Sequence, residues 1–584
     1  MRASRAFLTV TAAVLASTVL ASCVFPTPPP GDPVPSLTLT ALDEGAGVVT
    51  VTATPANFTP GEVQFRLDSG STPIAVDRSA PFTVTLYTAE HRAGAHTVHA
   101  LGIGGGYLVG ESLPVQLRQP NFVFVLLDDL DEWASPYWDA MPQTRALLAD
   151  RGLSFANAFV VDPLCCPSRA TFLTGRYPHN TGVFSNTPPD GGYQQFRDGG
   201  AQNDTVATRL RAAGYRTGFV GKYLNGYPSD PTAVPPGWDE WFGLVGFIWF
   251  AYGYKANHNG TVLEYGSAES DYQTDVLADV AVDFVEGSEA NDAQPFFLTV
   301  QPVAPHTFIE PAPRHANHPF VNAPLPTRPN TNEADVSDKP TWLRDGYPVL
   351  TQAEIDTLTA DYRRAMGSLL AVDDLVADVA AALDANGELD DTVFVFSSDN
   401  GMNWGAHRHR GKEVPYEESL GVPFVVAGPG VRTGTESALV TNADFAPTVL
   451  HLAGLGEPAD LDGRSLVPLL RATGAPWRSN FLVELNGTDD ENLHTYADVL
   501  TTLSQQGRLV RTPTYRALRT TKYLYVEWYD GTPHEYELYD LRYDPYQLDN
   551  LLATPAGQSA YATIRQTLQA RLDALKACTG AACR

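Results

Sequence analysis

Four short, mainly apolar segments constrain the fold of this chain most strongly. They span residues 122–127, 217–220, 296–300 and 393–396. Strands that are apolar along their whole length are typical of a parallel sheet covered by helices on both faces. Helices are expected between them at residues 144–150, 204–213 (capped by Asp204) and 353–383. This alternation predicts a doubly wound, mostly parallel α/β sheet.

Charged or polar side chains follow each of the four segments. They are Asp128 and Asp129, Lys222, His306, and the pair Asp399 and Asn400. The carboxyl ends of neighbouring parallel strands meet at one edge of a sheet, where ligands bind in such folds. A lone Asp-Asp pair would be better explained as a turn or a helix cap. Four such strand ends together predict one functional site.

The residue types in this set indicate the chemistry of the site. The Asp and Asn side chains offer only oxygen ligands, which favours a hard cation such as Ca²⁺ or Mg²⁺ over zinc. Lys222, together with Lys412 and Arg410, supplies positive charge suited to an oxyanion. His306 could donate a proton to a departing oxygen.

The segment from Cys165 to Arg176, CCPSRATFLTGR, is the most specific in the chain. Pro167 suits the first position of a helix and Gly175 suits its end, so Cys165 is expected just ahead of a helix N-terminus that favours anions. Adjacent cysteines lack the spacing of a structural zinc site, and a disulfide between neighbours is strained. Cys166 is better explained as a small buried side chain than as a reactive thiol.

This segment resembles the C-x-P-S-R-x-x-x-L-T-G signature of type I sulfatases, whose first Cys is oxidised to Cα-formylglycine. The resemblance extends over residues 120 to about 552 and is greatest to the N-acetylglucosamine-6-sulfatase branch. The stretches that carry this branch resemblance are residues 163–169, 177–180, 221–225 and 272–278. Leu224 agrees with the branch, whereas Asn403 stands where the branch usually has His. That departure leaves the sugar preference open.

The resemblance implies an alkaline-phosphatase-like mixed sheet flanked by helices, with a smaller antiparallel C-terminal subdomain. The expected catalytic domain spans residues 119–475 and the subdomain residues 476–584. The implied catalytic residues are Cys165, Arg169, Lys222, His306 and Lys412. The implied ligands of Ca²⁺ (or Mg²⁺) are Asp128, Asp129, formylglycine 165, Asp399 and Asn400. The implied substrate-binding residues are His179, Lys222, Arg410 and Lys412.

The resemblance also implies a mechanism and a partner. A formylglycine hydrate at position 165, held by Arg169, attacks sulfur while the metal and the two lysines spread the charge of the transferring group. His306 then protonates the leaving alcohol. A formylglycine-generating enzyme is the implied partner during maturation.

The first residues are typical of an export signal. Arg2 and Arg5 precede a short apolar run that ends in Leu-Ala-Ser-Cys23, which resembles the bacterial lipobox, so residues 1–23 are expected to be a lipoprotein signal peptide. An ordinary secretory signal with a free Cys23 thiol is the alternative. Residues 24–36 are Pro-rich and predict a stiff tether. The chain is therefore expected at the cell surface, attached to the membrane only through a lipid on Cys23.

Residues 37–118 alternate polar and apolar side chains in short strands and resemble an Ig-like β-sandwich. A spacer role is the simpler interpretation, and glycan or cell-wall binding is the alternative. Near the other end, Cys578 and Cys583 are close enough in an exported chain to form a small disulfide loop.

Two further groups of residues were ambiguous in the sequence. An aromatic cluster is explained mostly by core packing, although one or two rings could stack on a sugar: Trp238, Trp241, Phe242, Phe247, Trp249, Phe250, Tyr252 and Tyr254. The basic run from His407 to Arg410 is a solvated loop or, beside Lys412, faces an anionic substrate.

The net charge of −28 excludes nucleic acid as a general partner and opposes long polysulfated chains. Short sulfated sugars fit better, captured by a local group of cations: Arg169, Arg176, Lys222, Arg408, Arg410 and Lys412. The prediction is an exported hydrolase of 6-O-sulfate esters on N-acetylglucosamine-type sugars. Alternatives are an aryl or choline sulfatase, a phosphonate or phosphodiester hydrolase of the same fold, and an inactive surface adhesin.

Overall fold

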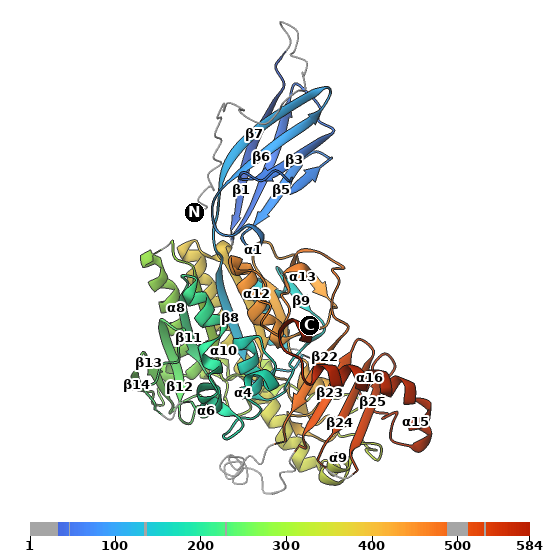
Figure 1. Ribbon diagram of the computed structural model, residues 1–584. Helices are drawn as coiled ribbons and strands as arrows, with labels where there is room; N and C mark the ends of the chain where they lie inside the picture. Colours follow the sequence, from blue (N-terminus) through green and yellow to red (C-terminus); the bar gives the residue numbers. More distant parts are fainter. Residues whose placement is uncertain are drawn as a thin grey trace.

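The chain forms three structural parts (Figure 1). The computed structural model describes residues 33–45, 47–132, 137–227, 230–291, 293–487, 512–530 and 533–584. The expected signal peptide, with Cys23, and most of the tether lie outside the described residues. Among the described helices, none combines the length and the apolar composition needed to cross a membrane.

The largest part is built on a ten-stranded sheet in the order β14-β13-β12-β11-β15-β8-β16-β19-β9-β20. The four predicted strands are neighbours at its centre and run parallel. They are β11 (Arg216–Gly221), β15 (Phe296–Gln301), β8 (Asn121–Leu127) and β16 (Thr392–Ser398). Every residue of β8, β15 and β16 is buried, as expected for strands covered on both faces.

Outside this parallel centre the sheet is mixed, so the expectation of a mostly parallel layer is wrong at its edges. Antiparallel pairs join β12 (Glu240–Val245) to β13 (Lys255–His258), and β13 to β14 (Thr261–Glu264). On the other side, β16 pairs antiparallel with β19 (Phe424–Ala427), and β19 pairs antiparallel with β9 (Leu153–Phe155). The last strand is β20 (Gly434–Glu436). Neighbours joined by short connections can reverse direction, which the apolar runs alone do not reveal.

The long predicted helix is α10 (Gln352–Asn386), which packs against α8 (Gln273–Ser288) on one face of the sheet. A capping box between Thr351 and Glu354 begins it, and Gly387 in the left-handed region ends it. The other face is covered by helices that include α4 (Cys165–Thr174), α7 (Val206–Ala212) and α12 (Phe445–Leu450).

Two predicted helices differ from the observed ones. Thr205, and not Asp204, caps α7, because Thr205 and Thr208 hydrogen-bond each other's backbone N–H. Asp204 instead accepts from Arg209 and Arg176. The predicted helix at 144–150 is α3 (Pro142–Thr144) continued by a π-helical turn (Arg145–Ala149).

A two-sheet β-sandwich precedes β8 and has its own apolar core. One sheet contains β1 (Ser36–Gly45), β2 (Val48–Ala56) and β5 (Phe82–Tyr87). The other contains β4 (Ala75–Asp77), β3 (Glu62–Leu67), β6 (Gly94–Gly104) and β7 (Tyr107–Leu117). Figure 1 shows the sandwich, in blue, at the amino end of β8 and far from α4. Its likeness to Ig-like modules stays a prediction.

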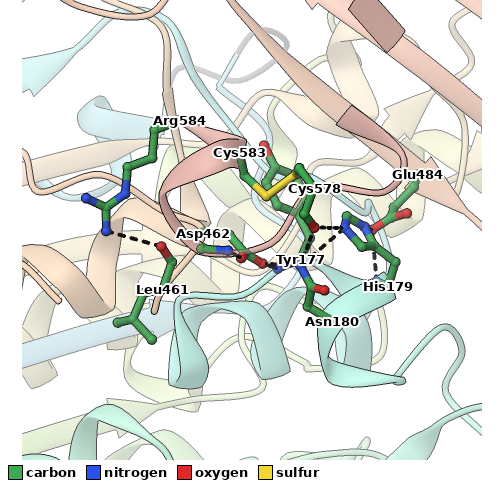
Figure 2. The surroundings of a disulfide bond; sticks show 10 residues. Tyr177, His179, Asn180, Leu461, Asp462, Glu484, Cys578, Cys583 and Arg584 are labelled. Atoms are coloured by element: carbon green, nitrogen blue, oxygen red, sulfur yellow. Dashed lines mark hydrogen bonds and ion pairs between the residues drawn. A yellow bond between two sulfur atoms is a disulfide. The ribbon is translucent and has the colours of Figure 1, made fainter. Parts of the chain in front are cut away.

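The C-terminal part is an antiparallel sheet covered by α16 (Ala562–Leu575). Its strands are β22 (Asn480–Leu485), β23 (Tyr515–Thr520), β24 (Tyr523–Trp528) and β25 (Glu535–Asp540). Cys578 and Cys583 form a disulfide after α16. The carbonyl oxygen of Cys578 accepts hydrogen bonds from His179 and Asn180, just beyond α4 (Figure 2). The end of the chain is thereby attached to the segment that follows the Cys165 helix.

Candidate active site

The polar residues that follow the four central strands are buried together with the first turns of α4. Three ion pairs link them: Lys222 Nζ to Asp128 Oδ2 at 2.5 Å, Arg169 Nε to Asp399 Oδ2 at 2.7 Å, and Lys412 Nζ to Asp129 Oδ1 at 2.5 Å. We call these six residues, with Cys165, Asn400 and His306, the central cluster. The residues that follow the four central strands are therefore adjacent in space, as expected.

Cys165 is the first residue of α4, whereas it was expected two residues ahead of the first helical position. Leu164 is the N-cap, so Pro167 occupies the third helical position and the expected register is wrong by two residues. The Cys165 Sγ lies 2.9 Å from Lys412 Nζ and 3.8 Å from Asp128 Oδ1. Burial raises the pKa of this thiol to about 11, although Lys222 and Lys412 oppose the shift. Gly175 ends the helix in the left-handed region, as expected.

Cys166 is fully buried and accepts a hydrogen bond from the backbone N–H of Asn225 at 3.0 Å. Neither Cys165 nor Cys166 is in a disulfide. The two neighbouring thiols thus occupy different environments, one among charges and one in the apolar layer of α4.

Oxygen atoms on the acidic side of the central cluster fit a hard cation. One ligand atom each from Asp128, Asp129 and Cys165 lie within 4.8 Å of one another. The Asn400 Nδ2 donates to Asp129 Oδ1 at 2.7 Å, while the buried Asn400 Oδ1 has no hydrogen-bond partner among the residues that the structure describes. Asp129 adopts a φ of 68°, and its backbone N–H donates to Asp399 Oδ1. An unsatisfied amide oxygen beside three carboxylates is a donor set for Ca²⁺ or Mg²⁺.

Both lysines of the central cluster are held in their charged form. Burial opposes the charge on Lys222 and Lys412, but Asp128 and Asp129 outweigh it and raise the pKa of both amines. Burial likewise opposes ionisation of these two aspartates, and the lysines hold their pKa below the ordinary value. The central cluster therefore contains three paired cations and three paired carboxylates.

Arg169 is held in place by a residue that the sequence analysis missed. Its Nη1 donates to Gln301 Oε1 and to the Lys222 carbonyl oxygen, both at 2.8 Å. Gln301 is the last residue of β15, so the strand-end argument could have included it. The Arg169 side chain is 1% exposed. Its ion pairs with Asp399 at 2.7 Å and with Asp128 at 3.9 Å also hold the guanidinium in one orientation.

His306 lies at the side of the central cluster that leads toward a loop of aromatic residues. Its Nε2 is 3.5 Å from Asp129 Oδ2, and its ring is 4.6 Å from the Trp249 ring. The Trp249 ring also lies 4.6 Å from Lys222 Nζ. Burial lowers the pKa of His306, while Asp129 and Asp128 act in the opposite direction.

Several cations expected near a substrate are engaged elsewhere. The His179 ring binds Glu484 and the Cys578 carbonyl oxygen, under the C-terminal disulfide loop (Figure 2). The Arg410 side chain is 38% exposed and faces Glu354 at 3.4 Å. Arg176 pairs with Asp204 and Asp460.

The basic run 407–410 is not a solvated loop. His407 is buried against Glu333, and Arg408 donates to the backbone carbonyl oxygens of residues 333 and 334. His409 is also buried. Of the six cations expected to gather, the structure brings together Arg169, Lys222 and Lys412.

The sulfatase family model matches residues 120–455 of this chain. N-acetylglucosamine-6-sulfatase of Capra hircus is 34% identical over 486 residues, which cover 80% of this chain and 85% of the goat protein. The Homo sapiens protein of the same name is 33% identical over 524 residues, 86% of this chain and 93% of its own length. Arylsulfatase of Volvox carteri is 33% identical over 511 residues, 80% of this chain and 76% of the algal protein.

Solved structures share the fold at lower identity. A protein in complex with its substrate D-glucosamine-2-N,6-O-disulfate superposes with a TM-score of 0.64 at 24% identity, covering 78% of this chain and 97% of that one. A phosphonate monoester hydrolase from Silicibacter pomeroyi superposes with a TM-score of 0.57 at 23% identity, covering 78% and 96%.

Proposed function

The chain belongs to the sulfatase family and hydrolyses sulfate esters, and we propose that its substrate is the 6-O-sulfate of an N-acetylglucosamine-type sugar. The observation that carries the proposal is that Cys165, at the start of α4, contacts Asp128 and Lys412 within a cluster built from the residues that follow the four central strands. The name shared by the goat and human relatives, N-acetylglucosamine-6-sulfatase, supports the sugar.

The proposal assigns Cys165 as the site of conversion to formylglycine, which supplies a nucleophilic oxygen at the start of α4. Asp128, Asp129, Asp399 and Asn400, with residue 165, would hold Ca²⁺ (or Mg²⁺), which neutralises charge on the sulfate ester when bound. The fit rests on the all-oxygen donor set and on the buried, unsatisfied Asn400 Oδ1. The three cations and three carboxylates balance, so a bound dication leaves an excess of positive charge that favours an anion.

The chain's own residues do the rest of the work in this proposal. Lys222 and Lys412 stabilise the charge on the transferring sulfuryl group, since both amines are fixed and buried beside Cys165. Arg169 orients residue 165, since hydrogen bonds to Asp399 and Gln301 hold the guanidinium in place. His306 protonates the leaving oxygen, which is needed because a primary alkoxide is a poor leaving group.

We further propose that the chain is exported and anchored by a lipid on Cys23, with the Pro-rich segment and the β-sandwich as a spacer. The support is the charged start, the apolar run and the Leu-Ala-Ser-Cys sequence. A short sulfated sugar suits this enzyme better than a long polysulfated chain, because the net charge is −28.

A second candidate is hydrolysis of phosphonate monoesters or phosphodiesters. The similarity in fold to a phosphonate monoester hydrolase favours it, since a hard cation and two lysines suit either oxyanion.

The test uses the full chain produced together with a formylglycine-generating enzyme. We expect this enzyme to release sulfate from N-acetylglucosamine-6-sulfate. The Cys165→Ala variant should release none, because its nucleophile is absent. Mass spectrometry of the peptide that contains residue 165 should show the thiol replaced by an aldehyde. No release from this sugar beside rapid hydrolysis of nitrophenyl sulfate, choline sulfate or a phosphonate ester would contradict the proposed substrate.

A further inference from the structure

Three phenylalanine rings form a row that leads from His306 to the protein surface. Successive ring centroids are 5.6 Å apart from His306 to Phe308, 6.5 Å from Phe308 to Phe250, and 5.0 Å from Phe250 to Phe247. Phe308 is half-buried, whereas Phe250 is 44% exposed and Phe247 is 49% exposed. We call these three residues the aromatic row.

The aromatic row adjoins the central cluster. Phe247 and Phe250 lie on the loop after β12, and Trp249 of the same loop contacts both Lys222 and His306. The sequence left open whether a ring of this aromatic cluster faces a sugar. Trp238, Trp241 and Phe242 are buried in the core, but Phe247 and Phe250 are not.

Hydrogen bonds from Gln273 hold the loop after β12 in one conformation. The buried Gln273 side chain donates from Nε2 to the carbonyl oxygens of Ile248 and Phe250, at 3.0 and 3.1 Å. The backbone N–H of Gln273 donates to the carbonyl oxygen of Ala251. These bonds fix the backbone on both sides of Trp249, so the rings are positioned before any ligand arrives and binding loses little loop entropy.

The direction of the aromatic row matches the path of the leaving group. His306 is the proposed proton donor to the leaving oxygen, so the sugar attached to that oxygen extends away from Cys165 and past His306. The row starts there and is longer than a single sugar ring. Sugar rings present C–H faces that pack on aromatic faces, and phenylalanine offers no charge for a second sulfate.

From this geometry we propose that the aromatic row is a subsite for a second, uncharged sugar ring. The preferred substrate is then a 6-sulfated hexosamine joined to at least one further sugar, rather than the free monosaccharide. Phe308 contacts the sulfated sugar, and Phe250 and Phe247 contact the next one. The inference rests on the proposed function and specifies its substrate further.

The test compares two substrates: N-acetylglucosamine-6-sulfate and a disaccharide in which this sugar is linked to a neutral sugar. We expect the full chain to show a kcat/KM roughly tenfold higher for the disaccharide, as stacking on exposed aromatic rings allows. Phe247→Ala should remove most of this preference through a higher KM and leave the monosaccharide within about twofold. Phe247→Tyr, which keeps the ring, should retain the preference.

Tyr543→Ala is the matched control, because Tyr543 is 82% exposed and follows β25 in the C-terminal part. It should leave both substrates unchanged. Thermal unfolding should be the same for all three variants, since the replaced side chains are exposed. Equal kcat/KM for the two substrates in the unaltered chain, or a preference that survives Phe247→Ala, would overturn the proposal.

A binding measurement separates the subsite from the proposed function. Saturation-transfer NMR with the unsulfated disaccharide should show contact to the full chain that weakens in Phe247→Ala. No contact with the full chain would overturn the aromatic row as a sugar subsite. Contact without turnover of either sulfated sugar would support the subsite and contradict the proposed sulfate ester.

Discussion

Each cation of the central cluster faces a carboxylate that is buried with it. The pairs are Lys222 with Asp128, Lys412 with Asp129, and Arg169 with Asp399. Removing one member of a buried pair leaves an uncompensated charge and costs roughly 3–5 kcal/mol of stability. Loss of activity in such variants therefore reports folding as well as catalysis. His306 is the better residue for a test of chemistry, because its replacement breaks none of these three pairs.

His306→Ala should affect substrates according to their leaving groups. We expect the kcat for N-acetylglucosamine-6-sulfate to fall by about 10²- to 10⁴-fold, because the alkoxide then departs without a proton. The loss for nitrophenyl sulfate should be much smaller, since nitrophenolate is a stable leaving group. The measurement is the ratio of the two losses, and similar losses would remove the proposed role of His306.

Calcium should stabilise the folded chain through the acidic residues of the central cluster. At a concentration 100 times its Kd, a ligand that binds only the folded state adds about 2.7 kcal/mol to the free energy of unfolding. We therefore expect Ca²⁺ to raise the Tm and a chelator to lower both Tm and activity. Asp399→Asn keeps the shape of the side chain and should abolish the shift in Tm. A Tm that does not respond to Ca²⁺ or Mg²⁺ in the unaltered chain would contradict the proposed metal.

At the scale of elements, the features that depend on short runs of neighbouring residues, such as the central strands, could be predicted from the sequence. The four apolar segments are the four central parallel strands, and the residues after them meet because parallel strands end at one edge. The basic run 407–410 was misjudged because its partners are distant in sequence. His407 binds Glu333, and Arg408 binds carbonyl oxygens of that same segment, while both have positive φ. His179 similarly binds Cys578, near the far end of the chain.

The burial of His409, shortly before Lys412, leads us to expect that the folded chain loses stability in mild acid. Burial lowers the pKa of His409 to about 3, with His407 and Arg410 acting in the same direction. Its pKa in the unfolded chain is about 6.5, so the unfolded state binds more protons below that pH. The stability that depends on a neutral His409 is complete above pH 6.5 and is lost as the pH falls toward 3.

His409→Gln removes this titration and keeps a polar side chain. Relative to this variant, the unaltered chain should lose about 2 kcal/mol of unfolding free energy between pH 7 and pH 5. Urea unfolding at pH 5, 6, 7 and 8 measures the difference. A difference that does not change with pH would show that His409 is charged, or solvated, in the folded state.

At the scale of the whole molecule, the β-sandwich lies at the amino end of β8 (Figure 1), whereas Asp128 and Asp129 of the central cluster follow its carboxyl end. The sandwich is packed on the α/β part by specific contacts. The helix α1 (Thr88–His91) packs on the π-helical segment His451–Leu455 of the α/β part. The Arg471 guanidinium lies 3.7 Å from the centroid of the Tyr87 ring and pairs with Glu90. The two parts are thus joined by an interface as well as by the chain.

Removing the sandwich should therefore lower stability and leave catalysis intact. A chain that begins at residue 119 retains every residue of the central cluster, so we expect its kcat/KM to stay within about twofold of the full chain. Its Tm should fall, because Arg471 loses both Tyr87 and Glu90 and the apolar surface beneath α1 meets water. Arg471→Gln in the full chain is the matched variant and should give a smaller fall in Tm, since it weakens the interface without removing it.

Circular dichroism establishes that the shortened chain is folded, and sulfate release measures its activity. A folded, shortened chain with a strongly reduced kcat would mean that the sandwich affects the active site through β8, whereas an unchanged Tm would mean that the interface does not stabilise the α/β part.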